Sequence, residues 1–204
     1  MSTIITRLFD TYEHASLAVT ELETAGIPHS AISLVANNVD DRYTNVVPTA
    51  HDHDASGAGA GAGTGASIGT VLGGGAGLLA GLGMLAIPGI GPVVAAGWLI
   101  ATAVGAGVGA VSGGLLGSLV GAGVSETDAH VYAEGVRRGG TLVTVRAEDH
   151  QVGTVESILD KNSPVDPSQR GEEYRAEGWS RFDEASPPYV PGTASTVRPG
   201  TTAF

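Results

Sequence analysis

The sequence predicts an α+β fold that is interrupted by a long uncharged insert, and three observations support this prediction. The chain has 204 residues with 32 glycines, and 23 of these glycines lie between residues 55 and 125. This stretch contains no Asp, Glu, Lys, Arg or His. Both flanks, in contrast, combine short β-branched runs with amphipathic helical patterns. Neither flank alone is long enough to bury a core, so we expect the two to form one domain.

The first flank, residues 1–55, predicts a strand, a helix and a second strand. Thr3–Phe9 is short and rich in β-branched residues, which is typical of a strand. Asp10 and Glu13 have the spacing of a capping box and predict that a helix begins there. Ala31–Asn37 (AISLVAN) predicts a second strand, and a right-handed crossover through the helix makes the two strands parallel.

The second flank, residues 125–169, supplies the remaining elements of the predicted domain. Ser125 and Asp128 form a capping pattern, which predicts a helix over 125–138. A strand at Thr141–Ala147 and a helix that is capped by Asp149 follow. Pro164–Ser168 is interpreted as a short edge strand, which tolerates proline. Together the flanks fit a ferredoxin-like sandwich, and two independent small lobes are the alternative.

Residues 170–204 predict a mostly irregular tail, because Pro, Gly, Ser and Thr dominate the composition. The aromatic residues Trp179, Phe182 and Tyr189 are too many for an inert linker. We therefore expect them to fix part of the tail onto the domain or onto a neighbouring subunit.

The insert, residues 56–124, predicts a helical hairpin with arms over 64–86 and 92–123 and a turn at Ile87–Pro92. Glycine in a helix costs about 1 kcal/mol relative to alanine, so these arms need a compensating interaction. Residues four apart share one helix face, and a glycine stripe lets another backbone approach closely, as in a glycine zipper. The predicted helix-packing residues are Gly65, Gly69, Gly73, Gly77, Gly81, Gly97, Gly105, Gly109, Gly113, Gly117 and Gly121.

The glycine-rich insert has three alternative interpretations. The sequence GAGTGA resembles a dinucleotide-binding loop, but no strand precedes it and no lysine accompanies it. A solvated Gly/Ala linker fits 56–63, whereas Ile68, Leu72 and Leu79 are too apolar for one. A hairpin that is buried inside a soluble oligomer remains the main rival to a membrane hairpin.

Each predicted arm exceeds the ~20 apolar residues that cross a bilayer, although its Gly and Ala content makes insertion marginal. A membrane hairpin with an uncharged turn keeps both flanks on one side of the bilayer, as a shared domain requires. The opening MSTIITRLFD lacks the basic and then apolar pattern of a secretory signal. We therefore expect a hairpin in, or associated with, the cytoplasmic face of the cell membrane.

The net charge and the side-chain chemistry argue against several classes of function. The net charge of −11 argues against nucleic acid as a partner. His51 and His53 lie in the acidic sequence HDHD, which we interpret as a solvated loop rather than a metal site. The chain contains no cysteine and no Gly-x-Ser-x-Gly pattern. We therefore expect no enzyme activity, no cofactor and no metal.

Several segments are similar to the general stress protein 17M-like (heat-induced stress protein) domain family, over roughly residues 1–190. The similarity lies in IITRLFDTYEHASLAVTELETAGIPHSAISLVANN, LAIPGIGPVVAAG, GGTLVTVRA and EGWSRFDEASPPY. This resemblance implies a ferredoxin-like domain and a role in the stress response, and it implies no catalytic residues.

The leading hypothesis is a non-enzymatic, stress-associated protein that self-assembles through a glycine-zipper hairpin at the cell membrane. Its partners are further copies of the chain and, at the membrane, lipid. The alternative is a soluble cytoplasmic homo-oligomer, such as a shell, filament or scaffold, whose hairpins bury one another. A third interpretation, a module that senses a small ligand on its sheet, needs a polar pocket.

Overall fold

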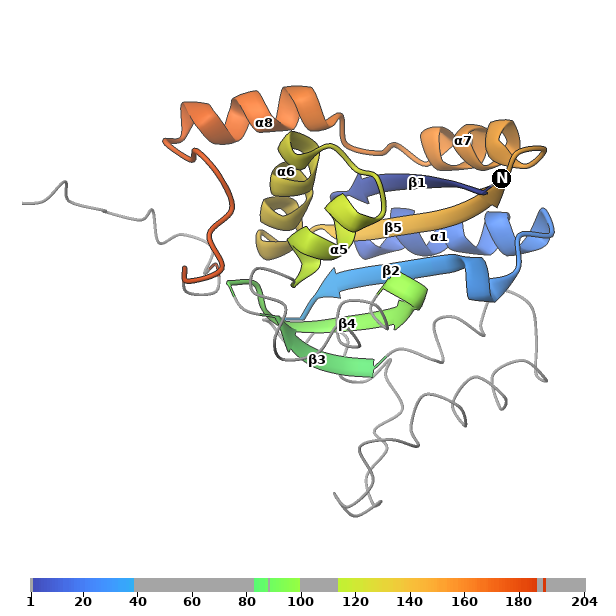
Figure 1. The fold of residues 1–204 in the computed structure, drawn as a ribbon, viewed down its shortest axis with the longest axis horizontal. Coiled ribbons are helices and arrows are strands. Elements are labelled where there is room, and N and C mark those ends of the chain that lie inside the picture. Colours follow the sequence, from blue (N-terminus) through green and yellow to red (C-terminus); the bar gives the residue numbers. More distant parts are fainter. Residues whose placement is uncertain (1, 39–82, 88, 100–113, 187–188, 190–204) are drawn as a thin grey trace, which may run out of the picture.

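The computed structural model describes residues 2–38, 83–87, 89–99, 114–186 and 189 (Figure 1). Mixed helices and strands make it an α+β fold, as the sequence predicts. The strands are β1 (Ser2–Phe9), β2 (Ile32–Asn37), β3 (Gly83–Ile87), β4 (Gly91–Gly97) and β5 (Thr141–Glu148). The helices are α1 (Tyr12–Thr24), the short 3-10 helix η1 (His29–Ala31), α5 (Leu115–Gly121), α6 (Glu126–Arg137), α7 (Val152–Lys161) and α8 (Pro167–Ala176).

The five strands form one sheet in the order β1-β5-β2-β4-β3, and every neighbouring pair is antiparallel. Strand β5 of the second flank therefore lies between β1 and β2 of the first flank, with Val145 opposite both Ile5 and Ile32. Since β1 and β2 both run against β5, they are parallel to each other, as the sequence predicts, although they are not neighbours.

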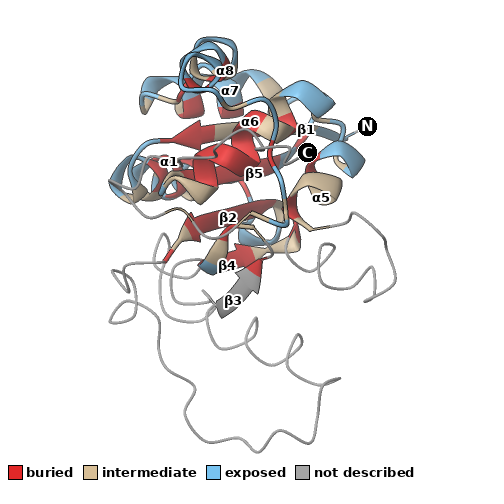
Figure 2. Cartoon of the chain, turned by 90° about the vertical axis from the view of Figure 1, so that its left-hand side faces the viewer, coloured by how far each residue is buried: buried red, intermediate tan, exposed pale blue. Residues whose placement is uncertain are grey.

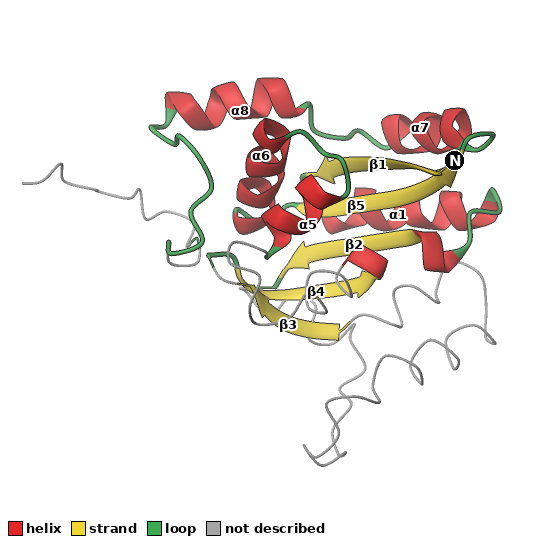
Figure 3. Ribbon diagram, viewed as in Figure 1, coloured by secondary structure: helices red, strands yellow, loops and turns green. Residues whose placement is uncertain are grey.

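Helices cover both faces of this sheet (Figures 1 and 3). On one face, α1 and α7 pack on apolar residues of β1, β2 and β5, with Phe9, Leu34 and Val143 at the centre. On the other face, α5 and α6 cover Leu8 and Leu142 together with residues of β4. Figure 2 shows that the central strands are mostly buried between the two layers. Burial on both faces explains why β2 is apolar along its length rather than alternating.

The ends of the helices partly follow the predicted caps. The Ser125 side chain accepts a hydrogen bond from the Asp128 backbone N–H at the start of α6, as the spacing predicts. Helix α1 begins one residue later than expected, because Thr11 rather than Asp10 caps it. Helix α7 follows Gln151, and Asp149 does not act as its cap.

The predicted helical hairpin is wrong in the middle of the insert, where the chain forms strands β3 and β4. The turn predicted at Ile87–Pro92 is present, but it joins two strands instead of two helices. Tertiary pairing explains the difference, because β4 lies against β2 and gains a ladder of backbone hydrogen bonds there. Helix α5 agrees with the end of the predicted second arm. Among the described residues, no helix is long and apolar enough to span a membrane.

The predicted irregular tail also needs correction, because its first residues belong to helix α8. Asp166 caps this helix by accepting a hydrogen bond from Gln169 N–H, and Pro167 occupies the first turn. Immediately before α8, Val165 donates a backbone hydrogen bond of 2.8 Å to Leu8 and forms a single bridge beside β1. The edge strand predicted at Pro164–Ser168 is therefore reduced to one residue.

Gly97 ends β4 with a positive φ of 99° and lies very close to β2. A Cβ atom placed on Gly97 is only 2.6 Å from Ser33 Cα. Ser33 lies opposite Gly97, and its hydroxyl donates a 2.9 Å hydrogen bond to the carbonyl of Ala96. The absence of a side chain at Gly97 thus allows β2 and β4 to meet.

We predict that Gly97→Ala lowers the free energy of unfolding by about 2 kcal/mol, because it adds backbone strain and a steric clash. Urea denaturation followed by circular dichroism measures the change. Gly121→Ala is the matched control, since no neighbouring atom lies within 4 Å of the Cβ position there. It should shift stability by at most about 1 kcal/mol. Equal losses in the two variants would contradict this account of Gly97.

Candidate functional site

The structure describes only three of the eleven predicted helix-packing glycines. Gly97 makes a close backbone approach, but as a strand residue and not on a helix. Gly117 and Gly121 lie on helix α5, and the Cβ position of Gly121 faces open space instead of a neighbouring backbone. The other eight residues, Gly65, Gly69, Gly73, Gly77, Gly81, Gly105, Gly109 and Gly113, lie outside the described residues.

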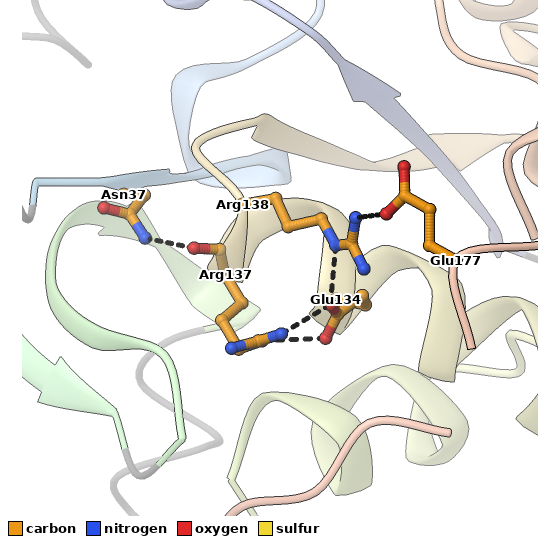
Figure 4. A network of polar contacts seen from close by, with 5 residues as sticks. All are labelled: Asn37, Glu134, Arg137, Arg138 and Glu177. Carbon is orange, nitrogen blue, oxygen red and sulfur yellow. Dashed lines mark hydrogen bonds and ion pairs between the residues drawn. The ribbon is translucent and has the colours of Figure 1, made fainter. Parts of the chain in front are cut away.

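The most connected polar group that the structure does describe is a charge cluster at the end of α6 (Figure 4). The side chain of Glu134 is 1% exposed and accepts hydrogen bonds from two arginines. Arg137 donates from Nε and Nη2, at 2.8 and 2.7 Å, and Arg138 donates from Nε at 2.7 Å. Because residues three and four apart share a helix face, α6 itself brings the three side chains together.

Other elements complete this cluster. The Asn37 side chain, at the end of β2, donates a 3.0 Å hydrogen bond to the Arg137 carbonyl. Arg138 also pairs with Glu177, just beyond α8. Burial disfavours the charge on Arg138, but hydrogen bonds to Glu177 and Glu134 outweigh this effect and raise the pKa of Arg138.

Aromatic rings lie against the same two arginines. The Arg138 guanidinium is 4.1 Å from the centroid of the Tyr174 ring on α8. The Tyr189 ring lies 5.4 Å from Arg137 and 5.5 Å from Arg138. Both arrangements have the geometry of cation–π interactions. Trp179 contacts Tyr174 edge to face, with the ring centroids 5.6 Å apart.

The cluster is suited to joining elements rather than to catalysis. Its two arginines face two carboxylates, so their charges cancel and no excess positive charge is directed at an anion. It contains neither a nucleophile nor a histidine. The cluster links the end of β2, the end of α6, α8 and the tail, and the aromatic residues of the tail contact the domain, as the sequence predicts.

A second polar group crosses three strands on the face covered by α6. The Thr6 and Thr144 hydroxyls are 3.2 Å apart, and Ser33 lies opposite Thr144 on the next strand. The Tyr132 hydroxyl of α6 donates a 3.4 Å hydrogen bond to the Thr6 carbonyl. Burial raises the pKa of Tyr132 to about 12, although the positive charge of Arg7 opposes this shift. These hydroxyls bind one another and the backbone, so they stabilise the sheet.

The described histidines do not assemble a metal site. His29 lies 3.1 Å from Glu23 and His150 lies 3.5 Å from Glu148, so each has a single carboxylate neighbour. No group of three or more potential ligands comes together in the part of the chain that the structure describes. His51 and His53 lie outside that part.

We did not predict the charge cluster from the sequence, although part of its signal is visible there. Glu134 is followed by arginines three and four residues later, which is the spacing of helical ion pairs. Such pairs usually lie on a solvated helix face, where they contribute little. In the structure the Glu134 side chain is buried, and Arg138 also contacts Glu177 and Tyr174. Sequence spacing does not reveal these long-range contacts.

We predict that Glu134→Gln lowers the free energy of unfolding by about 3 kcal/mol, because two part-buried guanidinium groups lose their shared counter-charge. Urea denaturation at neutral pH measures the loss. Glu177→Gln is the matched control, because the Glu177 side chain is 62% exposed. Its cost should be at most about 1 kcal/mol. Similar small losses in both variants would show that the buried carboxylate is not the centre of the cluster.

We also predict that stability falls as the pH rises from about 10 to about 12. The Tyr132 phenol ionises near pH 10.0 in the unfolded chain, whereas burial keeps it neutral to about pH 12 in the folded chain. The stabilisation is therefore complete below pH 10 and is lost above it, by about 1.4 kcal/mol per pH unit. Thermal unfolding against pH should show a steeper decline for the wild type than for Tyr132→Phe. Parallel curves would contradict this role.

No protein-family model, no curated protein and no solved structure matches this chain. The resemblance of the sequence to the general stress protein family therefore stays a prediction, and the function is inferred from the chain's own residues.

Proposed function

We propose that this chain is a non-enzymatic, stress-associated protein that self-assembles through the glycine-striped parts of its insert. One observation carries the proposal. Gly83 lies opposite Ala95 at the open end of the β3–β4 hairpin. Residue 83, which directly follows the first glycine-striped segment, therefore lies beside the strand that leads into the second one. Attachment of two glycine-striped segments at one place favours their contact through small residues.

The lengths of these segments favour an assembly of chains over a bilayer-spanning hairpin. The second glycine-striped segment lies between strand β4, which ends at Gly97, and Gly114, the N-cap of α5. The 16 residues between these two positions are fewer than the ~20 that a helix needs to cross a bilayer. The turn expected to cross the membrane instead packs on the domain, where Ile90 is fully buried. We therefore favour a homo-oligomer in which the apolar segments of several copies bury one another.

Association with the cytoplasmic face of the membrane is the second candidate. The first glycine-striped segment contains Ile68, Val71, Leu72 and Leu79 and no charged residue, so it has apolar surface to bury. Lipid and a second copy of the chain are alternative ways to cover that surface. The resemblance to stress proteins supports the stress-associated role in both cases.

We further propose that the domain is a ferredoxin-like sandwich extended by β3 and β4. The chain order β1, α1, β2, β5, α7 and the Val165 bridge corresponds to a βαββαβ unit. The order Val165, β1, β5, β2 across the sheet and the location of α1 and α7 on one face support this assignment. The hairpin then adds two strands beyond β2.

Fractionation tests where the protein assembles. Extracts are separated by high-speed sedimentation without detergent, and the supernatant is analysed by sedimentation velocity. We expect a defined particle larger than the 20.4 kDa chain in the supernatant. Recovery only in the membrane pellet, with release by detergent, would favour the membrane candidate. A monomer in the supernatant at all concentrations would contradict self-assembly.

We predict that Gly73→Leu and Gly109→Leu each weaken self-association at least tenfold, because leucine fills the groove that a second backbone needs. Leucine is the better helix former, so a loss of association cannot result from helix propensity. Leu72→Ile, beside the stripe, should have little effect. Sedimentation equilibrium of the three variants gives the comparison, and unchanged association in both glycine variants would refute the zipper.

A further inference from the structure

The C-terminal tail crosses directly over the turn between β3 and β4. Gly89, in this turn, has a positive φ of 75°. A Cβ atom placed on Gly89 is 2.8 Å from the Asp183 carbonyl oxygen and 2.8 Å from Glu184 Cα. These are backbone atoms, which cannot turn away as the end of a flexible side chain can. The tail and the turn are thus in contact at a point where no side chain fits.

The crossing segment has internal hydrogen bonds and an apolar anchor. The Asp183 side chain accepts a 2.9 Å hydrogen bond from Ala185 N–H, and the Asp183 carbonyl accepts one of 3.1 Å from Ser186 N–H. Phe182 is 4% exposed and belongs to the same hydrophobic cluster as Ile87 and Ile90 of the hairpin. A side chain at position 89 therefore displaces the whole segment and withdraws Phe182 from the core.

Contacts on both sides of this crossing hold the tail on the domain. Before it, Glu177 pairs with Arg138, and Trp179 packs against Tyr174. After it, the Tyr189 ring lies against Arg137 and Arg138. The crossing is therefore attached at both ends to the charge cluster of α6 and α8.

We infer that residues 177–186, together with Tyr189, act as a clasp that holds the β3–β4 hairpin on the sheet. The hairpin joins the sheet through one strand pair, β2–β4, so the tail supplies the covering contacts at its turn. Release of the clasp loosens the hairpin and frees the glycine-striped segments at its open end to meet those of a second copy. This last consequence rests on the proposed function, whereas the clasp itself rests on the contacts of the tail.

The test compares Gly89→Ala with Gly26→Ala in the full chain. Both glycines have a similar positive φ, 75° and 88°, so both variants carry similar backbone strain. The Cβ position at Gly26 has no neighbouring atom within 4 Å, so only the Gly89 variant displaces the tail. Phe182→Ala serves as a second way to release the clasp without a change in the turn. Amide hydrogen exchange reports on β4 and β5 separately, and sedimentation velocity reports on association.

We expect amides of Val93–Gly97 to exchange at least tenfold faster in Gly89→Ala and Phe182→Ala than in Gly26→Ala, with β5 amides unchanged. Equal exchange of β4 in all three variants overturns the clasp. Acceleration of β5 by the same factor as β4 also overturns it, because the tail would then stabilise the domain as a whole. Faster β4 exchange in a chain that remains monomeric supports the clasp and overturns the proposed self-assembly.

Discussion

The architecture depends on the pairing of β5 with β1 on one side and with β2 on the other. Strands β1 and β2 come from the first flank and β5 comes from the second, and β1 and β2 are both bonded to β5 instead of to each other. The apolar surface under α1 and α7 is continuous only because these three strands are adjacent. The hydroxyl row of Thr6, Thr144 and Ser33 on the opposite face has the same origin. Without β5, each flank would expose unpaired backbone groups and half a core.

The charge cluster around Glu134 joins α6, α8 and the tail to this sheet. Glu134 positions two arginines at the end of α6, and these arginines contact β2, α8 and the tail. The tail then reaches the turn of the β3–β4 hairpin, which belongs to the middle of the insert. A chain of contacts therefore leads from a buried carboxylate to the segment that carries the apolar sequence.

Sequence reasoning recovered the elements whose signals are local. The pair Ser125 and Asp128 caps α6 as predicted, and the strands and helices of both flanks lie close to their expected positions. On either side of the predicted turn, residues 83–86 and 93–97 are predicted as helical because their small and apolar residues are compatible with either structure. Only pairing with β2 decides between the two. The α8 signal, Asp166 followed by proline, was present but was outweighed by the polar composition of the tail. The contact of Arg138 with Glu177 joins residues 39 positions apart, and no local pattern encodes it.

Strand β5, which lies between β1 and β2 in the sheet, is the last of the five strands in the sequence, and this order affects how the protein is made. Strand β2 ends at Asn37 and β5 begins at Thr141, so 103 residues are synthesised between them. At roughly 5–20 residues per second, this takes roughly 5–20 s. During this interval β1 and β2 lack their shared partner while the uncharged insert emerges from the ribosome. The pairing of β5 with β1 and β2 is therefore long-range and slow to form, whereas β3 and β4 are close in sequence and can pair before β5 is synthesised.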